Sequence, residues 1–293
     1  MNKKQIELSN GEQYFYLDEG NNESVLVLLH GNMSSSIHFL PIIESLQNDF
    51  RIIAPDMRGF GDSSYNNHIN SIEDFGLDVF LLLDALNIKK YNLLGWSTGG
   101  AIALKMAAIR PEAVKKLILL ESASYRGYPI FKKDEKGNSI IGTHYDNKED
   151  MAQDTVQVSP FDNAFKNNDV ATIAAVWDQL IYPVNKPLKE DGNLFLSESM
   201  KQRNLVDVDW ALTTFNMSDS SNGVSKGDGT IKNVQCPVLS LWSEKDLVVP
   251  EYMIDETVES LNNAKKVVLK NAGHNPLVDC PEKVIIYIKE FAI

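Results

Sequence analysis

Three residues whose side chains could cooperate in catalysis stand far apart in the sequence, each after an apolar run. Ser97 follows "YNLLGW", Asp246 follows "VLSLWSEK", and His274 lies in the glycine-bearing stretch "NAGHNPLVD". A serine hydroxyl is a weak nucleophile until a base takes its proton, and a histidine base needs a carboxylate to orient its ring. We therefore expect Ser97 as nucleophile, His274 as general base and Asp246 as the orienting acid of one site.

The serine belongs to a G-x-S-x-G motif, from Gly95 to Gly99, between a predicted strand and a predicted helix. A sharp strand-to-helix turn leaves room only for small side chains on either side of the serine. It also places the hydroxyl at a helix N-terminus, where the helix dipole favours negative charge. The motif alone is equally typical of a structural turn or a phosphate-binding loop, although the Lys-Ser/Thr pair of a P-loop is absent. The flanking strand and helix favour the catalytic interpretation.

The five histidines can be ranked as candidate bases by their positions relative to the predicted strands. His274 and His30 both follow a strand, where the catalytic groups of parallel sheets gather. The His30-Gly31 pair is better explained by the shape of its own loop. The other three lie in helical or loop surroundings and receive no role: His38, His68 and His144.

The orienting carboxylate has rivals. Asp246 taken alone is more typical of a helix cap or turn residue, with "DLVVPE" running on from it. Glu121, at the end of the apolar run "LILLE", is the main alternative. Glu244 and Asp279 are weaker candidates, because neither falls where a strand has just ended at a turn.

Apolar runs with polar ends predict strands that are buried on both faces. Such runs occur at 24–31, 50–56, 91–97, 115–122, 236–246 and 264–274. Apolar spacing, an alanine-rich stretch and end signals predict helices between or after them, at 72–86, 98–110, 253–261 and 281–291. This alternation predicts the α/β class, with a mostly parallel central sheet flanked by helices.

The alternation stops between about residues 124 and 230. That span contains the polar stretches "KKDEKGN" and "SDSSNGVSKGDG", together with short helical patterns. An unstructured loop of such length would be implausible inside a compact domain. We therefore expect a core formed by 1–123 and 231–293, with 124–230 as an inserted, mainly helical cap.

Five pieces of the sequence resemble the α/β-hydrolase superfamily in their order and intervals, over nearly the whole chain outside 124–230. They are "LLHGN" (28–32), "DMRGFGDSS" (56–64), "GWSTGG" (95–100), "SEKDLVVP" (243–250) and "GHNPLVDCPEKVIIYIKEF" (273–291). The resemblance implies the α/β-hydrolase fold, in its serine-nucleophile branch with a cap, and the chain order Ser97, Asp246, His274 agrees with it. It also implies an oxyanion hole made by the main-chain N–H groups of Thr98 and Asn32, with Met33 as the alternative to Asn32.

The identity of residue 97 limits the reaction that the resemblance implies. Members of the superfamily that open epoxides or cleave carbon–halogen bonds carry aspartate there, whereas serine implies an acyl-enzyme route. We expect a carboxylic ester hydrolase for a small or medium acyl ester, with water as second substrate and neither cofactor nor metal. The alternatives are a lactonase, a thioesterase, a C–C bond hydrolase, an intracellular polyester depolymerase and, in another class, a non-catalytic ligand-binding relative.

Substrate selectivity is expected to come from 124–230. Its large aromatic side chains could line an apolar pocket, or could simply pack the segment onto the core: Tyr128, Tyr145, Trp177, Tyr182, Trp210 and Phe215. Arg126, Lys201 and Arg203 could meet an anionic substrate or form ion pairs elsewhere, and none is assigned. Trp96 could contact the acyl group or pack the turn.

Composition limits the partners. The net charge of −12 repels phosphate backbones and anionic lipid surfaces, so neither nucleic acid nor a membrane is expected as a partner. The N-terminal "MNKKQIELSN" lacks a signal-peptide pattern, and no apolar run is long enough for a transmembrane helix. We therefore expect a cytoplasmic protein in which Cys236 and Cys280 are reduced thiols. The sequence does not indicate an oligomeric state.

Overall fold

A mostly parallel sheet of eight strands forms the centre of the computed structural model, which describes residues 2–293. The strands are β1 (Lys4–Glu7), β2 (Gln13–Glu19), β3 (Val25–Leu29), β4 (Arg51–Pro55), β5 (Tyr91–Trp96), β6 (Val114–Leu120), β9 (Val238–Ser243) and β10 (Ala264–Leu269). Their order across the sheet is β1-β2-β4-β3-β5-β6-β9-β10. All pairs from β4 to β10 are parallel, and β2 and β1 add an antiparallel edge.

The α/β fold predicted from the apolar runs is confirmed, and each of the six runs contains one strand of the sheet. Strands β3 and β5 are buried along their whole length, as expected for central parallel strands. Strands β1 and β2 were not predicted. β1, "KQIE", is largely polar and exposed, whereas "QYFYLDE" of β2 is mostly buried, but its apolar residues are mainly aromatic and do not form the aliphatic run that marks the other strands.

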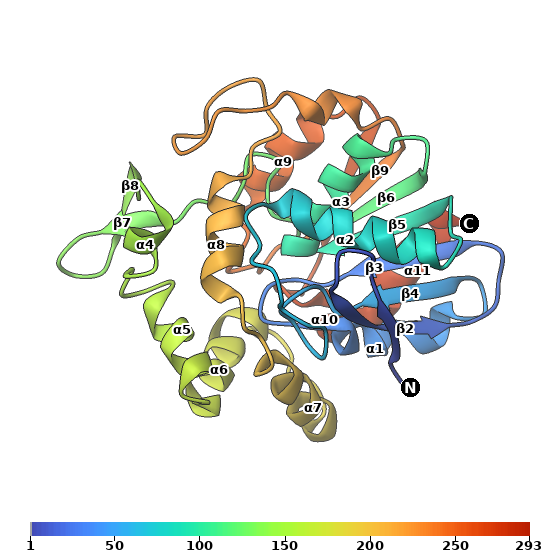
Figure 1. Ribbon diagram of the computed structural model, residues 1–293, viewed down its shortest axis with the longest axis horizontal. Helices are drawn as coiled ribbons and strands as arrows, with labels where there is room; N and C mark the ends of the chain where they lie inside the picture. Colours follow the sequence, from blue (N-terminus) through green and yellow to red (C-terminus); the bar gives the residue numbers. More distant parts are fainter. Residues whose placement is uncertain (1) are drawn as a thin grey trace.

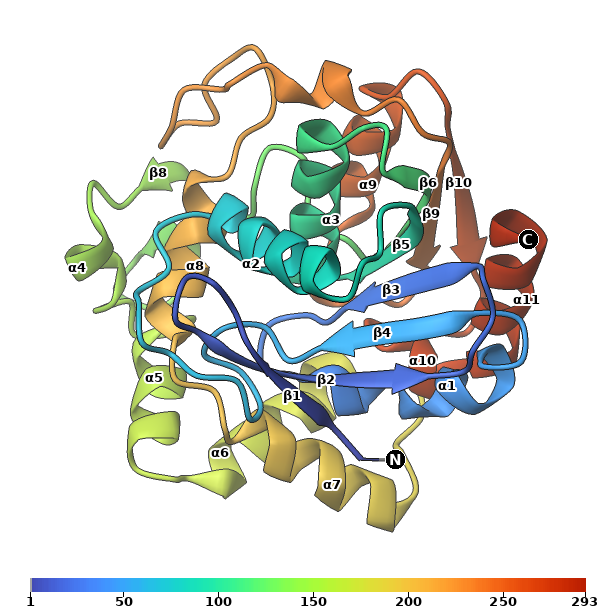
Figure 2. The same ribbon diagram turned by 45° about the vertical axis from the view of Figure 1, so that its right-hand side comes forward.

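Helices cover both faces of the sheet (Figure 2). The helices outside 124–230 are α1 (Leu40–Leu46), α2 (Ile72–Ala85), α3 (Thr98–Ile109), α9 (Glu251–Glu259), α10 (Pro276–Asp279) and α11 (Pro281–Ala292). Helices α2 and α3 pack on one face, and α1 and α11 pack on the other. Helix α2 begins with the expected capping box, in which Ser71 Oγ accepts a hydrogen bond from Asp74 N and the Asp74 side chain accepts one from Ser71 N.

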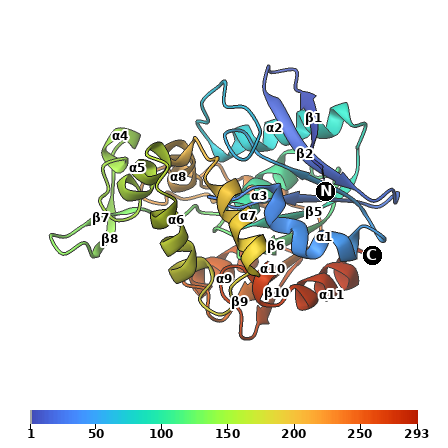
Figure 3. The same cartoon turned by 90° about the horizontal axis from the view of Figure 1, so that it is seen from below.

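Residues 124–230 lie beside the sheet, beyond the carboxyl ends of its parallel strands (Figures 1 and 3). They contain α4 (Lys148–Met151), α5 (Ser159–Lys166), α6 (Val170–Val176), α7 (Lys189–Ser199), α8 (Leu205–Thr214) and a separate hairpin of β7 (Phe131–Lys133) and β8 (Ser139–His144). The hairpin was not predicted, because its strands are short and largely exposed. The division into core and cap stays a prediction.

Two apolar clusters join this segment to the sheet. Val208 and Ala211 of α8 belong to the cluster that contains α2 and α3. Trp177 and Phe195 belong to the cluster on the opposite face, with α1 and α11. Residues 124–230 therefore pack against the apolar clusters on both faces of the sheet. Within residues 2–293, none of the helices combines the length and apolarity that crossing a bilayer requires.

Candidate active site

The turn that carries Ser97 joins β5 to α3 with a strained backbone. Ser97 has φ 54° and ψ −118°, a conformation that non-glycine residues rarely adopt. A Cβ atom on Gly95 would lie 2.1 Å from Gly99 O, and one on Gly99 would lie 2.1 Å from Leu29 O. Both glycines are therefore required by close main-chain contact, which is the physical basis of the G-x-S-x-G spacing here. The turn holds the Ser97 hydroxyl at the first turn of α3.

The structure brings Ser97, His274 and Asp246 into one hydrogen-bonded chain. His274 Nε2 lies 3.1 Å from Ser97 Oγ, and His274 Nδ1 lies 2.8 Å from Asp246 Oδ2. The side chains of His274 and Asp246 are 3% and 0% exposed, so water does not compete for the bond between them. A carboxylate only accepts hydrogen bonds, so Nδ1 carries the proton and Nε2 is free to accept one from Ser97.

Asp246 is fixed by the main chain as well as by His274. Its Oδ1 accepts hydrogen bonds from Val248 N at 2.7 Å and Val249 N at 2.9 Å. Asp246 is therefore also the turn residue that the sequence suggested, with Oδ1 binding the turn and Oδ2 facing His274. Burial opposes ionisation of this carboxyl, but the charge and hydrogen bond of His274 outweigh it and lower the pKa of Asp246. Asp246 is therefore the ionised carboxylate that faces the imidazole.

Glu121, the rival acid, lies behind Asp246 rather than beside His274. It is fully buried, has φ 46°, and its oxygens accept hydrogen bonds from Ser243 Oγ at 2.6 Å and Ser243 N at 3.0 Å. Burial, followed by the negative charge of Asp246, raises the pKa of Glu121 well above its ordinary value. The neutral acid also forms a hydrogen bond with Asp246, so the two carboxyl groups share one proton and one charge.

Hydrogen bonds between side chains and the main chain hold the loop that carries His274. The Trp96 indole Nε1 donates to His274 O at 2.9 Å, so this buried ring packs the turn and does not line the cavity described below. Glu244 and Asp279, the weaker rivals for the acid, accept hydrogen bonds from Asn271 N and Gly273 N. Their carboxylates therefore support the loop instead of the imidazole.

The geometry favours Asn32 over Met33 as an oxyanion donor. Met33 N donates to Gln202 Oε1 at 2.9 Å and to Asn32 Oδ1 at 3.0 Å, so it is already occupied. Within residues 2–293, the main-chain N–H groups of Asn32 and Thr98 have no acceptor. Thr98 is the first residue of α3, where an unpaired N–H is expected.

A cavity of about 190 Å³ opens onto Ser97 and His274. Its walls are mostly apolar and come largely from 124–230: Asn32, Met33, Tyr128, Ile130, Gln157, Phe161, Val176, Trp177, Leu180, Ile181, Asp209, Leu212 and Val248. Of the six aromatic residues considered from the sequence, Tyr128 and Trp177 line it. The volume suits a short acyl chain, since ligand pockets of drug-sized molecules are larger.

The basic residues considered for an anionic substrate bind elsewhere. The Arg126 guanidinium donates to Ser220 and Ser221, and the Arg203 guanidinium donates to main-chain oxygens that include Gly61 O. Lys201 pairs with Asp62 and Glu198. All three are therefore occupied in ion pairs or loop contacts.

His30 shapes its loop, as expected. Its Nε2 accepts a hydrogen bond from Met57 N at 3.1 Å, and its Nδ1 lies 2.8 Å from Gly31 O. Burial lowers the pKa of His30 to about 4, so the ring is neutral at physiological pH. A neutral ring with Nδ1–H donating to Gly31 O satisfies both contacts. His30 therefore fixes the start of the loop that carries Asn32 and Met33.

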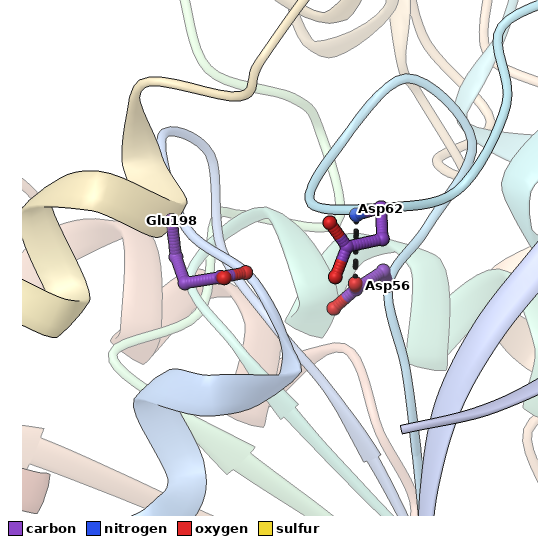
Figure 4. A group of neighbouring side chains, drawn as sticks. All are labelled: Asp56, Asp62 and Glu198. Atoms are coloured by element: carbon purple, nitrogen blue, oxygen red, sulfur yellow. Dashed lines mark hydrogen bonds between the residues drawn. The ribbon is translucent and has the colours of Figure 1, made fainter. Parts of the chain in front are cut away.

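A cluster of charged side chains lies next to Ser35 and Ser36, which follow this loop. Figure 4 shows Asp56, Asp62 and Glu198, whose oxygens approach closely enough to surround a cation. The Lys3 ammonium occupies that position, at 2.7 Å from Asp56, 2.8 Å from Asp62 and 2.7 Å from Glu198. Burial disfavours the charged lysine, but the attraction of Asp56 and the other carboxylates raises the pKa of Lys3 overall. The cluster is an ion-pair network that joins Lys3, the residue before β1, to α7.

Comparisons with known proteins agree with this fold. The family model described as alpha/beta hydrolase fold matches residues 24–281, so the chain belongs to this family of hydrolases. A cis-3-alkyl-4-alkyloxetan-2-one decarboxylase from Shewanella oneidensis is 27% identical over 301 residues, with 96% of this chain and 86% of that protein covered.

Solved structures show the same fold. An esterase from Exiguobacterium antarcticum has a TM-score of 0.77 at 19% identity, covering 99% of both chains. An enol-lactonase from Burkholderia xenovorans LB400 has a TM-score of 0.74 at 18% identity, covering 98% of this chain and 99% of that one. At these identities the likeness establishes the fold and leaves the substrate open.

Sequence reasoning missed several residues around the site. Gln202 and Asp209 of 124–230 form hydrogen bonds with Met33 N and with the Asn32 side chain, next to the candidate oxyanion donor. The sequence contained no signal for these contacts, because the partners lie about 170 residues apart and neither belongs to a motif.

Proposed function

We propose that the chain is a serine hydrolase that cleaves esters of short acyl groups through an acyl-enzyme intermediate. One observation carries the proposal: the unbroken chain of contacts from Asp246 Oδ2 to His274 Nδ1, at 2.8 Å, and from His274 Nε2 to Ser97 Oγ, at 3.1 Å. The small apolar cavity beside Ser97 supports a short acyl group. The family to which the chain belongs supports hydrolysis as the reaction class.

In the acylation step, Ser97 Oγ attacks the ester carbonyl carbon while His274 Nε2 takes the hydroxyl proton. Asp246 holds the Nδ1–H and stabilises the imidazolium that forms. The N–H groups of Asn32 and Thr98 donate to the oxyanion, an interaction worth about 3 kcal/mol for one donor. The tetrahedral intermediate then expels the alcohol, which leaves with the proton from His274.

In the deacylation step, a water molecule replaces the alcohol. His274 takes a proton from this water as its oxygen attacks the acyl carbon, and returns that proton to Ser97 Oγ when the carboxylic acid leaves. We propose that residues 124–230 act as the cap that selects the acyl group, because most of the cavity wall comes from that segment.

The proposal is tested with p-nitrophenyl acetate and p-nitrophenyl butyrate. Ser97→Ala should lower kcat by about 10⁵- to 10⁶-fold, leaving only the residual rate that the oxyanion donors and substrate binding provide. Ser122→Ala is the matched control: this serine is buried, with Oγ donating to Ala123 O, and its loss should leave hydrolysis nearly unchanged. Equal rates for wild type and Ser97→Ala would contradict the assignment.

Covalent labelling separates an enzyme from a ligand-binding relative. A fluorophosphonate reacts only with an activated serine, so we expect one label per chain, located at Ser97 by peptide mass spectrometry. A folded wild-type protein that resists the label would favour the ligand-binding alternative.

A further inference from the structure

Two side chains outside 124–230 orient the peptide group that carries the Asn32 N–H. A Cβ atom on Gly31 would lie 3.0 Å from Ser97 Cβ, so the peptide between Gly31 and Asn32 directly adjoins the nucleophile. Gly31 O accepts hydrogen bonds from Ser34 Oγ at 2.7 Å and from His30 Nδ1 at 2.8 Å. In a trans peptide the N–H points opposite to the C=O, so these contacts direct the Asn32 N–H away from both donors.

The next peptide group, which carries the Met33 N–H, is held by a side chain of 124–230. Met33 N donates to Gln202 Oε1 at 2.9 Å and to Asn32 Oδ1 at 3.0 Å. Of these two acceptors, only Gln202 lies outside the loop. Met33 has φ 54°, a conformation that a non-glycine residue keeps only when its surroundings impose it. Gln202 is therefore one of the contacts that hold this strained part of the loop.

Gln202 is itself fixed by its neighbours. It is 4% exposed and belongs to the segment 200–204, which joins α7 to α8. Its Nε2 donates to Asn32 Oδ1 at 2.7 Å and to Asn204 Oδ1 at 3.0 Å. Asn204 Nδ2 in turn donates to Arg58 O at 2.7 Å. The Gln202 amide therefore uses its oxygen and both of its N–H groups, which gives the side chain one orientation.

The Asn32 side chain links the loop to α8 as well. Its Oδ1 accepts hydrogen bonds from Met33 N and Gln202 Nε2. Its Nδ2 donates to Asp209 Oδ1 at 3.0 Å. Burial, partly opposed by this hydrogen bond, raises the pKa of Asp209 to about 8, so the carboxyl is protonated at neutral pH. The loop is thus bound to 124–230 through uncharged groups, and Asp209 brings no negative charge next to the oxyanion hole.

We propose that Gln202 is a positioning residue for the oxyanion hole, acting through the loop that carries Asn32 and Met33. The inference rests on the proposed hydrolytic function. Gln202 does not line the cavity and so does not touch the substrate there. By binding the Met33 N–H, it decides which main-chain N–H of the loop is left for the oxyanion, namely that of Asn32. Loss of Gln202 should therefore weaken binding of the transition state more than binding of the substrate.

Gln202→Met tests the proposal, because methionine has a similar length but lacks the donors and the strong acceptor of the amide. On p-nitrophenyl butyrate, kcat should fall by about 10- to 100-fold, since a misplaced oxyanion donor loses part of its effect. KM should change by less than about threefold. Ser199→Ala is the matched control: this serine is buried, its Oγ donates to Phe195 O, and the variant should keep wild-type kcat and KM.

Two ketones with the acyl chain of butyrate distinguish positioning from a general loosening of the fold. With 1,1,1-trifluoropentan-2-one, Ser97 Oγ adds to the carbonyl carbon, His274 takes the hydroxyl proton, and the hemiketal oxyanion binds the oxyanion donors. Pentan-2-one stays a ketone and reports binding of the acyl chain alone. In Gln202→Met, the inhibition constant of the trifluoroketone should rise by about the factor that kcat/KM loses, and that of pentan-2-one should stay within about threefold.

Asn32→Ala supplies a second variant, which carries the test if Gln202→Met does not fold. Alanine keeps the main-chain N–H at residue 32 but removes the side-chain oxygen that binds Met33 N and Gln202 Nε2. The same difference between the two ketones should appear. Because both side chains act on one N–H group, the double variant should lose little more than the more damaged single variant, whereas independent effects would multiply.

The outcomes separate this role from the proposed function. A folded Gln202→Met or Asn32→Ala protein that keeps wild-type kcat, or that loses affinity for both ketones equally, would overturn the role of Gln202 and leave the hydrolase intact. Losses that multiply in the double variant would do the same. Absence of Ser97-dependent hydrolysis in the wild type would refute the proposed function, and the positioning role with it.

Discussion

The carboxyl groups of Glu121 and Asp246 meet where the adjacent strands β6 and β9 end, and only Asp246 contacts the imidazole of His274. Glu121 is anchored from behind by both hydrogen-bonding groups of Ser243. Because the pKa of Glu121 is raised and that of Asp246 is lowered, Asp246 carries the negative charge and Glu121 stays protonated. This arrangement leads to opposite expectations for two variants that look equally conservative.

Asp246→Asn should lower kcat by about 10⁴-fold. The amide presents an N–H group to His274 Nδ1, which drives the ring to the tautomer whose Nε2 carries the proton and cannot accept one from Ser97. Steady-state kinetics on p-nitrophenyl butyrate measures the loss. Retention of a tenth or more of the wild-type kcat would show that another group orients the imidazole.

Glu121→Gln should retain most of the activity, with kcat/KM lowered less than about tenfold. An amide, like a protonated carboxyl, donates to Asp246, and the hydrogen bond lost to Ser243 is worth about 1 kcal/mol. Glu121→Leu removes the donor to Asp246 and both oxygens that accept hydrogen bonds from Ser243. Its kcat/KM should therefore fall by about 10- to 100-fold. If glutamine is as damaging as leucine, Glu121 is ionised rather than protonated in the folded protein.

Asp209→Asn should change how stability depends on pH. The folded protein keeps the Asp209 proton up to about pH 8, whereas the unfolded chain loses it near pH 4, so stability falls as pH rises between these values. The slope for this one group is about 1.4 kcal/mol per pH unit. Asparagine removes the effect, so the variant should gain in Tm relative to wild type from pH 5 to pH 8. Parallel Tm curves would contradict the raised pKa.

Lys3→Met should destabilise the fold by about 3 to 5 kcal/mol, since it leaves the Asp56 carboxylate buried without its cation, whereas Glu198 and Asp62 keep their ion pairs with Lys201. Lys4→Met is the matched control at the next residue, the first of β1. The Lys4 side chain is 55% exposed and pairs with Asp18 at 2.8 Å, so its loss should cost less than about 1 kcal/mol. Urea unfolding at pH 7 distinguishes them, and equal midpoints for the two variants would refute the role of Lys3.

The parallel part of the fold followed from local patterns. Continuous apolar runs such as 91–97 mark strands that are buried on both faces, because such strands have no polar side. The turn at Ser97 could also be predicted locally. Its short strand-to-helix connection leaves no room for a side chain at Gly95 or Gly99. Strands β1 and β2 were not predicted, because their place in the sheet depends on pairing with β4, which comes later in the chain.

The sequence by itself determined which residues could act as nucleophile, base and acid, because their types and their positions after strands are local facts. Only the tertiary structure decided that Asp246 and not Glu121 faces His274, that Met33 N is occupied by Gln202, and that Asp209 stands in the cavity. These contacts join segments separated by more than 25 residues, and in the last two cases by about 170. No local preference encodes them, since each depends on how the whole sheet and residues 124–230 pack together.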